Sequence, residues 1–321
     1  MTRGLTTGIV ADGQDLPVRE VTRRAQLAEK AGVDSVWLIQ LPGIRDSAGI
    51  LAAMAVLTER VTLGAGILPF YTRPPVVMAQ TAATIDDLSD GRFVLGVGIG
   101  HRLTAEWTLG TSLDQPVAAI REYLTIVTDL LRTGESHLDG RYFRAHATYT
   151  EPRRAGLPTY LGVLGPKMCE LAGELADGLL LWMCPSDYVR DVAIPHLRIG
   201  LSRAGRDPAD FPVTVLVPGS VSDNRDKDRE RLRRYLYTYA RVPNYRRMYE
   251  AAGFAGSLRT GTISDDLLDS VGVMGSHDDV CATIRRFHEA GATEVVMTPM
   301  AEAHYDDGLW LRTAEAAVAA R

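Results

Sequence analysis

Apolar residues along the chain gather in short continuous runs of strand length, separated by longer segments. Continuous runs, rather than alternating ones, are typical of parallel strands that are covered on both faces. Turn residues such as Gly, Pro and Asp bound most of these runs. The predicted strands are residues 7–10, 35–39, 61–68, 92–98, 159–163, 178–182, 213–217 and 294–298.

The segments between these runs carry the spacing of amphipathic helices. The clearest stripe is Val117, Ile120, Leu124, Val127 and Leu131, which recur every three or four residues. The predicted helices are residues 15–31, 46–58, 75–88, 115–132, 166–176, 186–204, 225–240 and 278–290, with broken helical segments continuing from 240 towards 252.

Eight alternating β-α units favour a (β/α)₈ TIM barrel that spans residues 1–321 as one domain. An open parallel sheet is the alternative, but closing eight repeats into a barrel is the more economical arrangement. The longest interruption is the segment 134–158, where Asp139-Gly140 between apolar residues predicts a hairpin. We expect this insertion to decorate the barrel.

Composition narrows the class of protein. Lys and Arg together number 35 against 40 Asp and Glu, a net charge of −5, so no basic excess supports binding to nucleic acid. The three cysteines lie far apart, which argues against a disulfide framework or a thiolate zinc site. Without a long apolar stretch or a signal peptide, we expect a soluble cytoplasmic protein with no membrane partner.

Two common hydrolytic sites are disfavoured. The histidines show no ligand-spaced pair such as H-x-H or H-E-x-x-H, so no metal site is expected. The G-x-S-x-G pattern of a serine nucleophile is also absent from the sequence.

In a TIM barrel the active site lies at the carboxyl ends of the strands, which directs attention to Asp12, Gln40 and His101. His101 can carry a proton near neutral pH, whereas the Gln40 amide can hold a ring or a substrate without a titratable proton. Asp12 could reach a substrate from the first strand. A hydrogen-bonded structural histidine at a strand end is the alternative for His101.

Two glycine-containing stretches invite a ligand. The run Gly96–Gly100 lacks Rossmann spacing, so it indicates either close packing inside the barrel or backbone that approaches a flat ligand. Gly165-Pro166-Lys167 opens a helix, whose first amides and lysine charge could bind phosphate. A solvated lysine is the other interpretation of Lys167.

Several motifs together resemble the luciferase-like monooxygenase family, in the branch that uses the deazaflavin coenzyme F420. They are 57–67 (LTERVTLGAGI), 71–76 (YTRPPV), 83–92 (ATIDDLSDGR), 95–100 (LGVGIG), 165–178 (GPKMCELAGELADG) and 287–291 (FHEAG). The family fold is a (β/α)₈ barrel, in agreement with the pattern of strands and helices.

The resemblance implies a cis peptide at Gly66–Ile67 that backs the deazaflavin ring, and a phosphate loop at Gly165. Gln40 departs from several relatives, which carry a histidine at that position, so oxidation of a sugar phosphate is not favoured. The cofactor-binding residues that the resemblance implies are Gly66, Ile67, Leu68, Gly98, Gly100, Thr104, Val163, Gly165, Pro166, Lys167 and Met168.

We therefore expect an F420-dependent oxidoreductase that passes a hydride between the deazaflavin C5 and a small organic substrate. A reductase is favoured, because a deazaflavin does not readily activate oxygen. His101, Gln40 and Asp12 are the candidate catalytic residues, and relatives imply a homodimer. The alternatives are an FMN-dependent monooxygenase on the same fold and a catalytically idle flavin-binding barrel.

Overall fold

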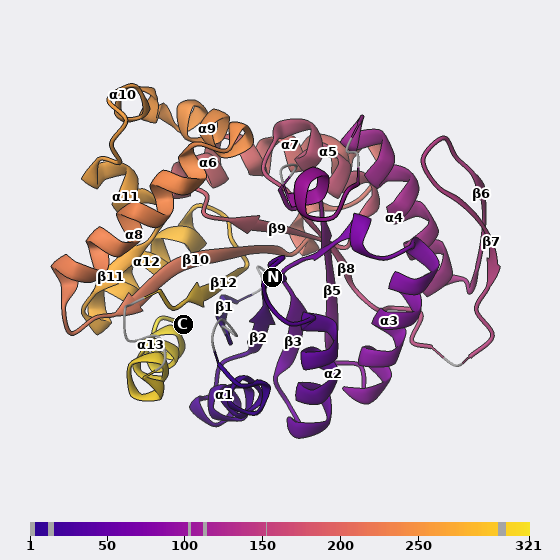
Figure 1. Ribbon diagram of the computed structural model, residues 1–321, viewed down its shortest axis with the longest axis horizontal. Coiled ribbons are helices and arrows are strands. Elements are labelled where there is room, and N and C mark those ends of the chain that lie inside the picture. Colours follow the sequence, from indigo (N-terminus) through magenta and orange to yellow (C-terminus); the bar gives the residue numbers. More distant parts are fainter. Residues whose placement is uncertain (1–3, 12–15, 102–103, 112–113, 152, 301–305) are drawn as a thin grey trace.

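Eight parallel strand positions close into a barrel in the computed structural model, which describes residues 4–11, 16–101, 104–111, 114–151, 153–300 and 306–321. Hydrogen bonding follows the order β1-β2-β3-β5-β8-β9-β10-β12 and returns to β1, which confirms the predicted fold (Figure 1). The barrel strands are β1 (Thr6–Val10), β2 (Ser35–Leu38), β3 (Thr62–Ala65) with β4 (Leu68–Pro69), β5 (Phe93–Gly98), β8 (Thr159–Gly162), β9 (Gly178–Trp182), β10 (Val213–Val221) and β12 (Glu294–Thr298).

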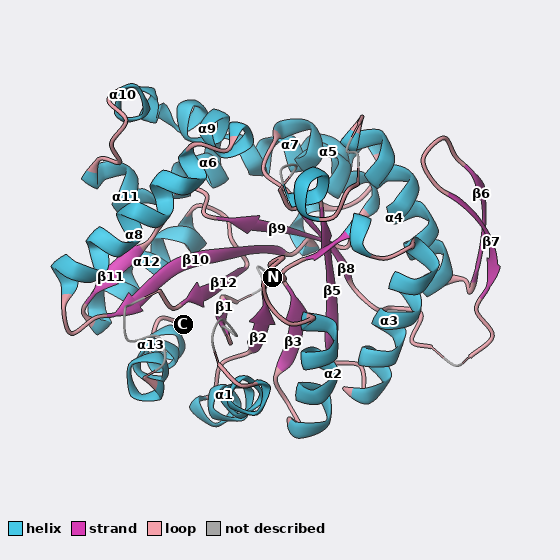
Figure 2. Cartoon of the chain, viewed as in Figure 1, coloured by secondary structure: helices cyan, strands magenta, loops and turns pink. Residues whose placement is uncertain are grey.

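Helices surround this barrel (Figure 2). Most of them match the predicted segments closely, although a π-helical segment, Val189–Ala193, interrupts the predicted helix 186–204. The helices are α1 (Val18–Ala31), α2 (Ser47–Leu57), α3 (Pro75–Leu88), α4 (Pro116–Arg132), α5 (Pro166–Leu175), α6 (Ser186–Tyr188), α7 (Ile194–Arg203), α8 (Arg225–Ala240), α9 (Pro243–Tyr249), α10 (Ala255–Arg259), α11 (Asp265–Val271), α12 (His277–Glu289) and α13 (Asp307–Ala319).

The third strand differs from its prediction as one run over 61–68. It breaks after Ala65, and the chain resumes as β4, whose Leu68 pairs with Val97 of β5. The intervening Gly66–Ile67 peptide is cis, as the resemblance implies. The hydrophobic pattern alone could not locate this break, because both halves are apolar.

The insertion forms the predicted hairpin from β6 (Glu135–Asp139) and β7 (Arg144–Thr148), which pair antiparallel and lie outside α4 (Figure 2). The Glu122 carboxylate of α4 accepts hydrogen bonds from the N–H groups of Arg141, Tyr142 and Phe143, at 2.7–2.9 Å. A single side chain therefore ties the turn of the hairpin to the barrel's outer layer.

Side chains fill the barrel interior in layers, because alternate residues of each strand point inward. In the floor, the Glu294 carboxylate accepts hydrogen bonds from Ser35 Oγ, from Thr214 Oγ1 at 2.7 Å and from Trp37 Nε1 at 3.4 Å. The middle layer is one apolar cluster of Val10, Trp37, Val94, Leu180, Leu216 and Val296.

Ile67 projects from the β3–β4 break into space left by glycines. A Cβ on Gly162 would lie 2.4 Å from Ile67 Cγ2, and one on Gly98 would lie 3.2 Å from the same side chain. A Cβ on Gly96 would lie 1.9 Å from the carbonyl oxygen of Ala65. Close packing inside the barrel, one of the two interpretations of the glycine run, thus accounts for Gly96 and Gly98.

Candidate active site

The carboxyl ends of the strands form the barrel mouth. Ile39, Ile67 and Trp182 lie here and pack against the middle layer from above. Their side chains are apolar or aromatic, so the floor of the mouth offers a flat ligand mainly van der Waals contact. Asp12, a candidate catalytic residue, lies outside the described residues.

His101 follows the carboxyl end of β5 and sits among aromatic rings. Its ring centroid is 5.4 Å from that of Tyr239 and 5.8 Å from that of Tyr245. Burial lowers the pKa of the His101 imidazole below its usual value near 6.5. The imidazole is therefore mostly neutral at neutral pH, and it is a better proton acceptor than donor there.

The tyrosines that contact His101 belong to a cluster that sequence reasoning missed. Tyr235 and Tyr239 lie one turn apart on α8, and Tyr245 and Tyr249 lie one turn apart on α9. Tyr239 also contacts Trp182, with ring centroids 6.4 Å apart. The four-residue spacing within each pair of tyrosines was the available sequence signal. It was overlooked because α8 is strongly charged.

Gln40 uses most of its hydrogen-bonding capacity within the protein. Its Oε1 accepts from the N–H of Ser47 at 2.7 Å and from Ser47 Oγ at 2.9 Å, and its Nε2 donates to the Leu41 carbonyl at 2.9 Å. An amide oxygen accepts about two hydrogen bonds, so only one N–H of Gln40 remains for a ligand. The residue joins the end of β2 to the start of α2.

At the amino end of α5 the N–H of Lys167 has no partner among the described residues, whereas the N–H groups of Met168 and Cys169 donate to the Gly165 carbonyl at 3.0 Å. Gly165 precedes the helix in an extended conformation. Because glycine has no side chain, no side-chain hydrogen bond caps the first turn. Pro166 removes one amide, which leaves the N–H of Lys167 among the groups that a helix start normally presents to an anion. Met168 and Val163 are buried beside this junction.

Lys167 already has an anionic partner. Its Nζ donates to the two carboxylate oxygens of Glu170 at 3.1 and 3.2 Å, while its side chain stays 76% exposed. Glu170 also accepts from Arg203 at 2.7 Å and His196 at 2.9 Å, and these partners lower its pKa to about 2. The presence of Lys167 in the first turn therefore does not by itself require an external anion.

Of the remaining predicted positions, Gly98, Gly100 and Thr104 belong to or follow β5, and Leu68 lies on β4 beside it. Gly100 has a φ of +63°, and a Cβ there would lie 2.9 Å from the Tyr71 hydroxyl. Burial raises the pKa of Tyr71 to about 12, so this phenol keeps its proton at neutral pH. Thr104 begins a π-helical segment, Thr104–Thr108, and Leu68 is buried.

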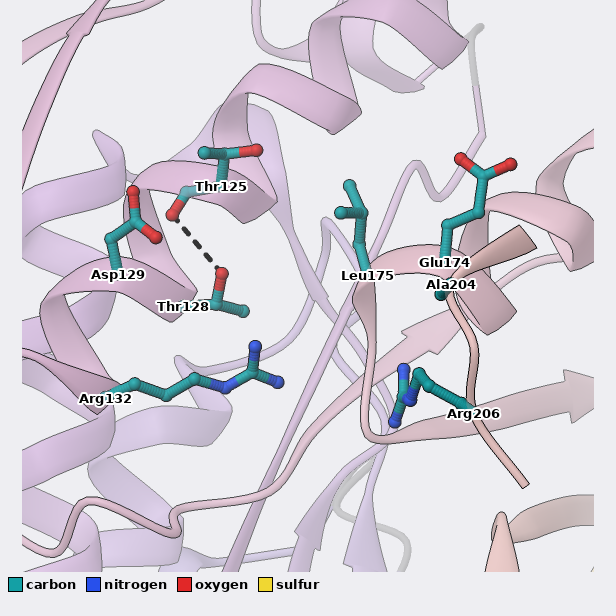
Figure 3. Close-up of a pocket in the computed structure, with 8 residues that line it drawn as sticks. All are labelled: Thr125, Thr128, Asp129, Arg132, Glu174, Leu175, Ala204 and Arg206. Atoms are coloured by element: carbon teal, nitrogen blue, oxygen red, sulfur yellow. Dashed lines mark hydrogen bonds between the residues drawn. The ribbon is translucent and has the colours of Figure 1, made fainter. Parts of the chain in front are cut away.

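A groove away from the mouth is a weaker candidate (Figure 3). It lies between the carboxyl-terminal halves of α4 and α5, on the side of the barrel opposite the expected active site. Its Arg132 pairs with Asp177 at 2.6 Å, and its Arg206 donates to the carbonyls of Gly173 and Ala176. The arginines thus serve to join helices and loops.

Residues 4–294 match the family model described as luciferase-like monooxygenase. The chain belongs to the luciferase-like monooxygenase family. Its similarity to a 5,10-methylenetetrahydromethanopterin reductase of Methanolobus tindarius is 28% identity, covering 87% of this chain and 90% of that protein. An F420-dependent glucose-6-phosphate dehydrogenase of Microbacterium testaceum is 32% identical and covers 73% of each chain.

A solved structure gives the same picture of the fold. The coenzyme F420-dependent tetrahydromethanopterin reductase from Methanopyrus kandleri superposes with a TM-score of 0.80 at 24% identity, covering 97% of each chain. The resemblance to the F420-dependent branch of the luciferase-like family is thereby confirmed, and the chain is an enzyme of that family.

Among the described residues, no group of three or more His, Cys, Asp or Glu side chains is arranged to hold a metal ion. The described helices also include none that is both long and apolar enough to span a membrane.

Proposed function

We propose that the protein, acting as one barrel domain over residues 1–321, is an F420-dependent oxidoreductase. It would transfer a hydride between C5 of the deazaflavin and a small organic substrate, working as a reductase. The observation that carries the proposal is the amino end of α5, where the N–H of Lys167 has no partner among the described residues, at the same barrel end as the β3–β4 break. F420-dependent relatives along most of the chain support the choice of cofactor.

The residues present fit this cofactor. The uncapped first turn of α5 and Lys167 suit a phosphate group, and Glu170 would hold the lysine near the helix start. Ile67 and the glycines behind it give the mouth a wall without charged groups, which suits a flat ring. When bound, F420 would supply a ring carbon that gives or accepts a hydride.

Reduction of a carbonyl or imine also needs a proton, and His101 is the residue that we assign to move it. Its protonated form, the minor form at neutral pH because burial lowers the pKa of His101, can give a proton to a substrate at the mouth and return to neutral imidazole. Tyr239 and Tyr245 fix the orientation of the ring by packing against it. Asp12, which lies outside the described residues, stays a second candidate.

Cofactor titration tests this function against FMN use and an idle barrel. We expect purified protein to bind F420 tightly, with saturable quenching of the deazaflavin fluorescence, and to bind FMN at least tenfold more weakly. An affinity order that favours FMN would point to the monooxygenase alternative. Saturable F420 binding without hydride transfer to any tested acceptor would point to the idle barrel.

We also propose that the enzyme is a homodimer formed through α2 and α3. The sequence of α2, SAGILAAMAVL, is apolar nearly all round, and Val56 and Leu57 are 63% and 45% exposed. Val77 and Leu88 of α3 are each 42% exposed. An apolar helix surface of this kind is usually covered by a partner. A monomeric mass by light scattering at micromolar concentration would contradict the proposal.

A further inference from the structure

Thr298 ends β12 on the face that points into the barrel. Every second residue of β12 points to the same face, so this inward face carries Glu294, Val296 and Thr298. Glu294 lies in the floor of the barrel and Val296 lies in the middle layer. The side chain of Thr298 therefore lies in the next layer up, at the mouth. Ile39 and Trp182 occupy the same level, two residues beyond Trp37 and Leu180 of the middle layer.

The hydroxyl of Thr298 is buried and has no hydrogen-bond partner among the described residues. The residue is 5% exposed, and its Oγ1 is shielded from solvent. Other buried threonines are satisfied: Thr214 Oγ1 donates to Glu294, and Thr313 Oγ1 accepts from the N–H of Val221 at 3.1 Å. Because buried hydroxyls are almost always paired, the unpaired Thr298 hydroxyl at this inward strand end points to a partner that the described residues do not supply.

The position of β12 in the barrel favours the substrate, rather than the cofactor, as the partner of Thr298. In the ring of eight strands, β12 lies opposite β5, four positions away in either direction. The residues assigned to F420 lie at the β3–β4 break, on β4, at and beyond the end of β5, and at the β8–α5 junction. A flat ring held on that wall would leave the Thr298 wall to the substrate.

The described surroundings disfavour a charged substrate group at this wall. The described side chains placed at this level, Thr298, Ile39 and Trp182, carry no charge. Trp182 and Ile39 offer apolar contact instead. A hydroxyl among apolar neighbours can satisfy one neutral polar atom, whereas an anion would lose its hydration without gaining a counter-charge.

We propose that Thr298 is a specificity-determining residue whose hydroxyl hydrogen-bonds the polar atom of an uncharged carbonyl or imine substrate. The inference rests on the proposed function. A threonine hydroxyl both donates and accepts, so it can bond a carbonyl oxygen and also the alcohol formed from it. Thr298 would then hold the substrate in both oxidation states.

The test compares Thr298→Val, Thr298→Ser and the matched control Thr313→Val. Thermal unfolding of the protein alone, F420 titration, and steady-state reduction of uncharged ketones, enones and imines with reduced F420 are measured for each. Thr298→Val should leave the melting temperature unchanged or raised, because it removes an unpaired hydroxyl. Thr313→Val should lower it, because the N–H of Val221 loses its partner.

For substrates, we expect Thr298→Val to raise KM about tenfold with a smaller change in kcat, as loss of one neutral hydrogen bond predicts. The F420 affinity should change less than twofold, and Thr298→Ser should restore most of the substrate affinity. Unchanged KM in Thr298→Val, or destabilisation equal to that in Thr313→Val, would overturn the assignment.

Two further outcomes separate this inference from the proposed function. If wild-type protein binds F420 but reduces only charged substrates such as sugar phosphates, the uncharged substrate class is wrong while the cofactor assignment stands. If F420 does not bind, the proposed function fails, and the Thr298 assignment falls with it.

Discussion

Glu294 and Thr298 sit on the same inward face of β12, one at the floor of the barrel and one at its mouth. The floor carboxylate is surrounded by donors from three side chains on β2 and β10. The mouth hydroxyl has no partner among the described residues. Four residues of one strand therefore separate a saturated polar group from an open one.

This contrast shows how one barrel divides its tasks. At the floor, Glu294 is bonded to Ser35, Trp37 and Thr214, so substitutions there should act on stability. At the mouth, the Thr298 hydroxyl has no partner among the described residues, so substitutions there should act on binding or turnover. A floor variant that altered binding or turnover rather than stability, or a mouth variant that altered stability instead, would contradict this division.

The largest expected effect is at His101. His101→Ala should lower turnover by about 10²–10³, the range of general acid–base catalysis, with F420 affinity nearly unchanged. His101→Gln should be almost as slow, because it keeps a hydrogen bond but loses the titratable proton. Single-turnover and steady-state rates check this, and full turnover in His101→Gln would reduce His101 to a positioning residue.

The pH dependence of the reaction sharpens this assignment. Burial lowers the pKa of His101, so the protonated donor is populated only below its usual value near 6.5. The rate of substrate reduction should therefore rise as the pH falls through the lowered pKa, and the rate of the reverse oxidation should fall over the same range. A reduction profile that is flat between pH 5 and 7 would contradict proton donation by His101.

The next effect concerns the phosphate. Lys167→Ala should weaken F420 binding by about tenfold to a hundredfold, because a charge-assisted hydrogen bond is worth ~1.5–3 kcal/mol. Exposure and the existing contact with Glu170 favour the lower end of this range. Lys30→Ala is the control, since it removes an equal charge from the exposed last turn of α1. Equal affinities for the two variants would remove Lys167 from the site.

The smallest effect is expected at the floor. Glu294→Gln should destabilise the protein by about 1–3 kcal/mol without changing KM, because an amide N–H₂ replaces an oxygen that accepts from Ser35 or Thr214. Chemical denaturation monitored by circular dichroism measures the first quantity. A larger change in KM than in stability would contradict the division between floor and mouth.

Desolvation raises the pKa of Glu294, which fixes the sign of its pH dependence. The folded state binds this proton more tightly than the unfolded state does. The resulting stabilisation is complete below the unfolded pKa and is lost as the pH rises through the folded pKa. The stability advantage of wild type over Glu294→Gln should thus be greater at pH 5 than at pH 8.

The barrel was largely predictable from sequence, because each strand is a continuous apolar run bounded by turn residues. The helices and strands that escaped prediction include α10, α11, α13 and β11 (Val273–Gly275), and β11 pairs with the far end of β10. The strand has only three residues, too short for a periodic signal. The sequence of α13 is rich in alanine, and its apolar residues do not form a narrow stripe.

The candidate site was less accessible to such reasoning. The strand-end positions of Gln40, His101 and Lys167 followed from the fold, but their partners did not. Gln40 accepts a hydrogen bond from Ser47 across a loop, and no local sequence spacing predicts this contact. The Lys167–Glu170 pair, by contrast, follows the three-residue spacing of neighbours on a helix and could have been anticipated. Thr298 looks in the sequence like any other strand-end residue.

The packing of Ile67 has a consequence for redesign of the mouth. Its Cγ2 occupies volume that a Cβ on Gly162 would need, and the other nearest atoms leave room, at 3.7 Å. Alanine at Gly162 should therefore be harmful alone and better tolerated beside a smaller residue at position 67. At Gly98 a Cβ would also lie 2.8 Å from the backbone carbonyl oxygen of Gly162, so a smaller residue 67 should not rescue alanine there. Libraries that vary positions 67 and 162 one at a time would miss this viable combination, whereas joint variation of the two would reach it.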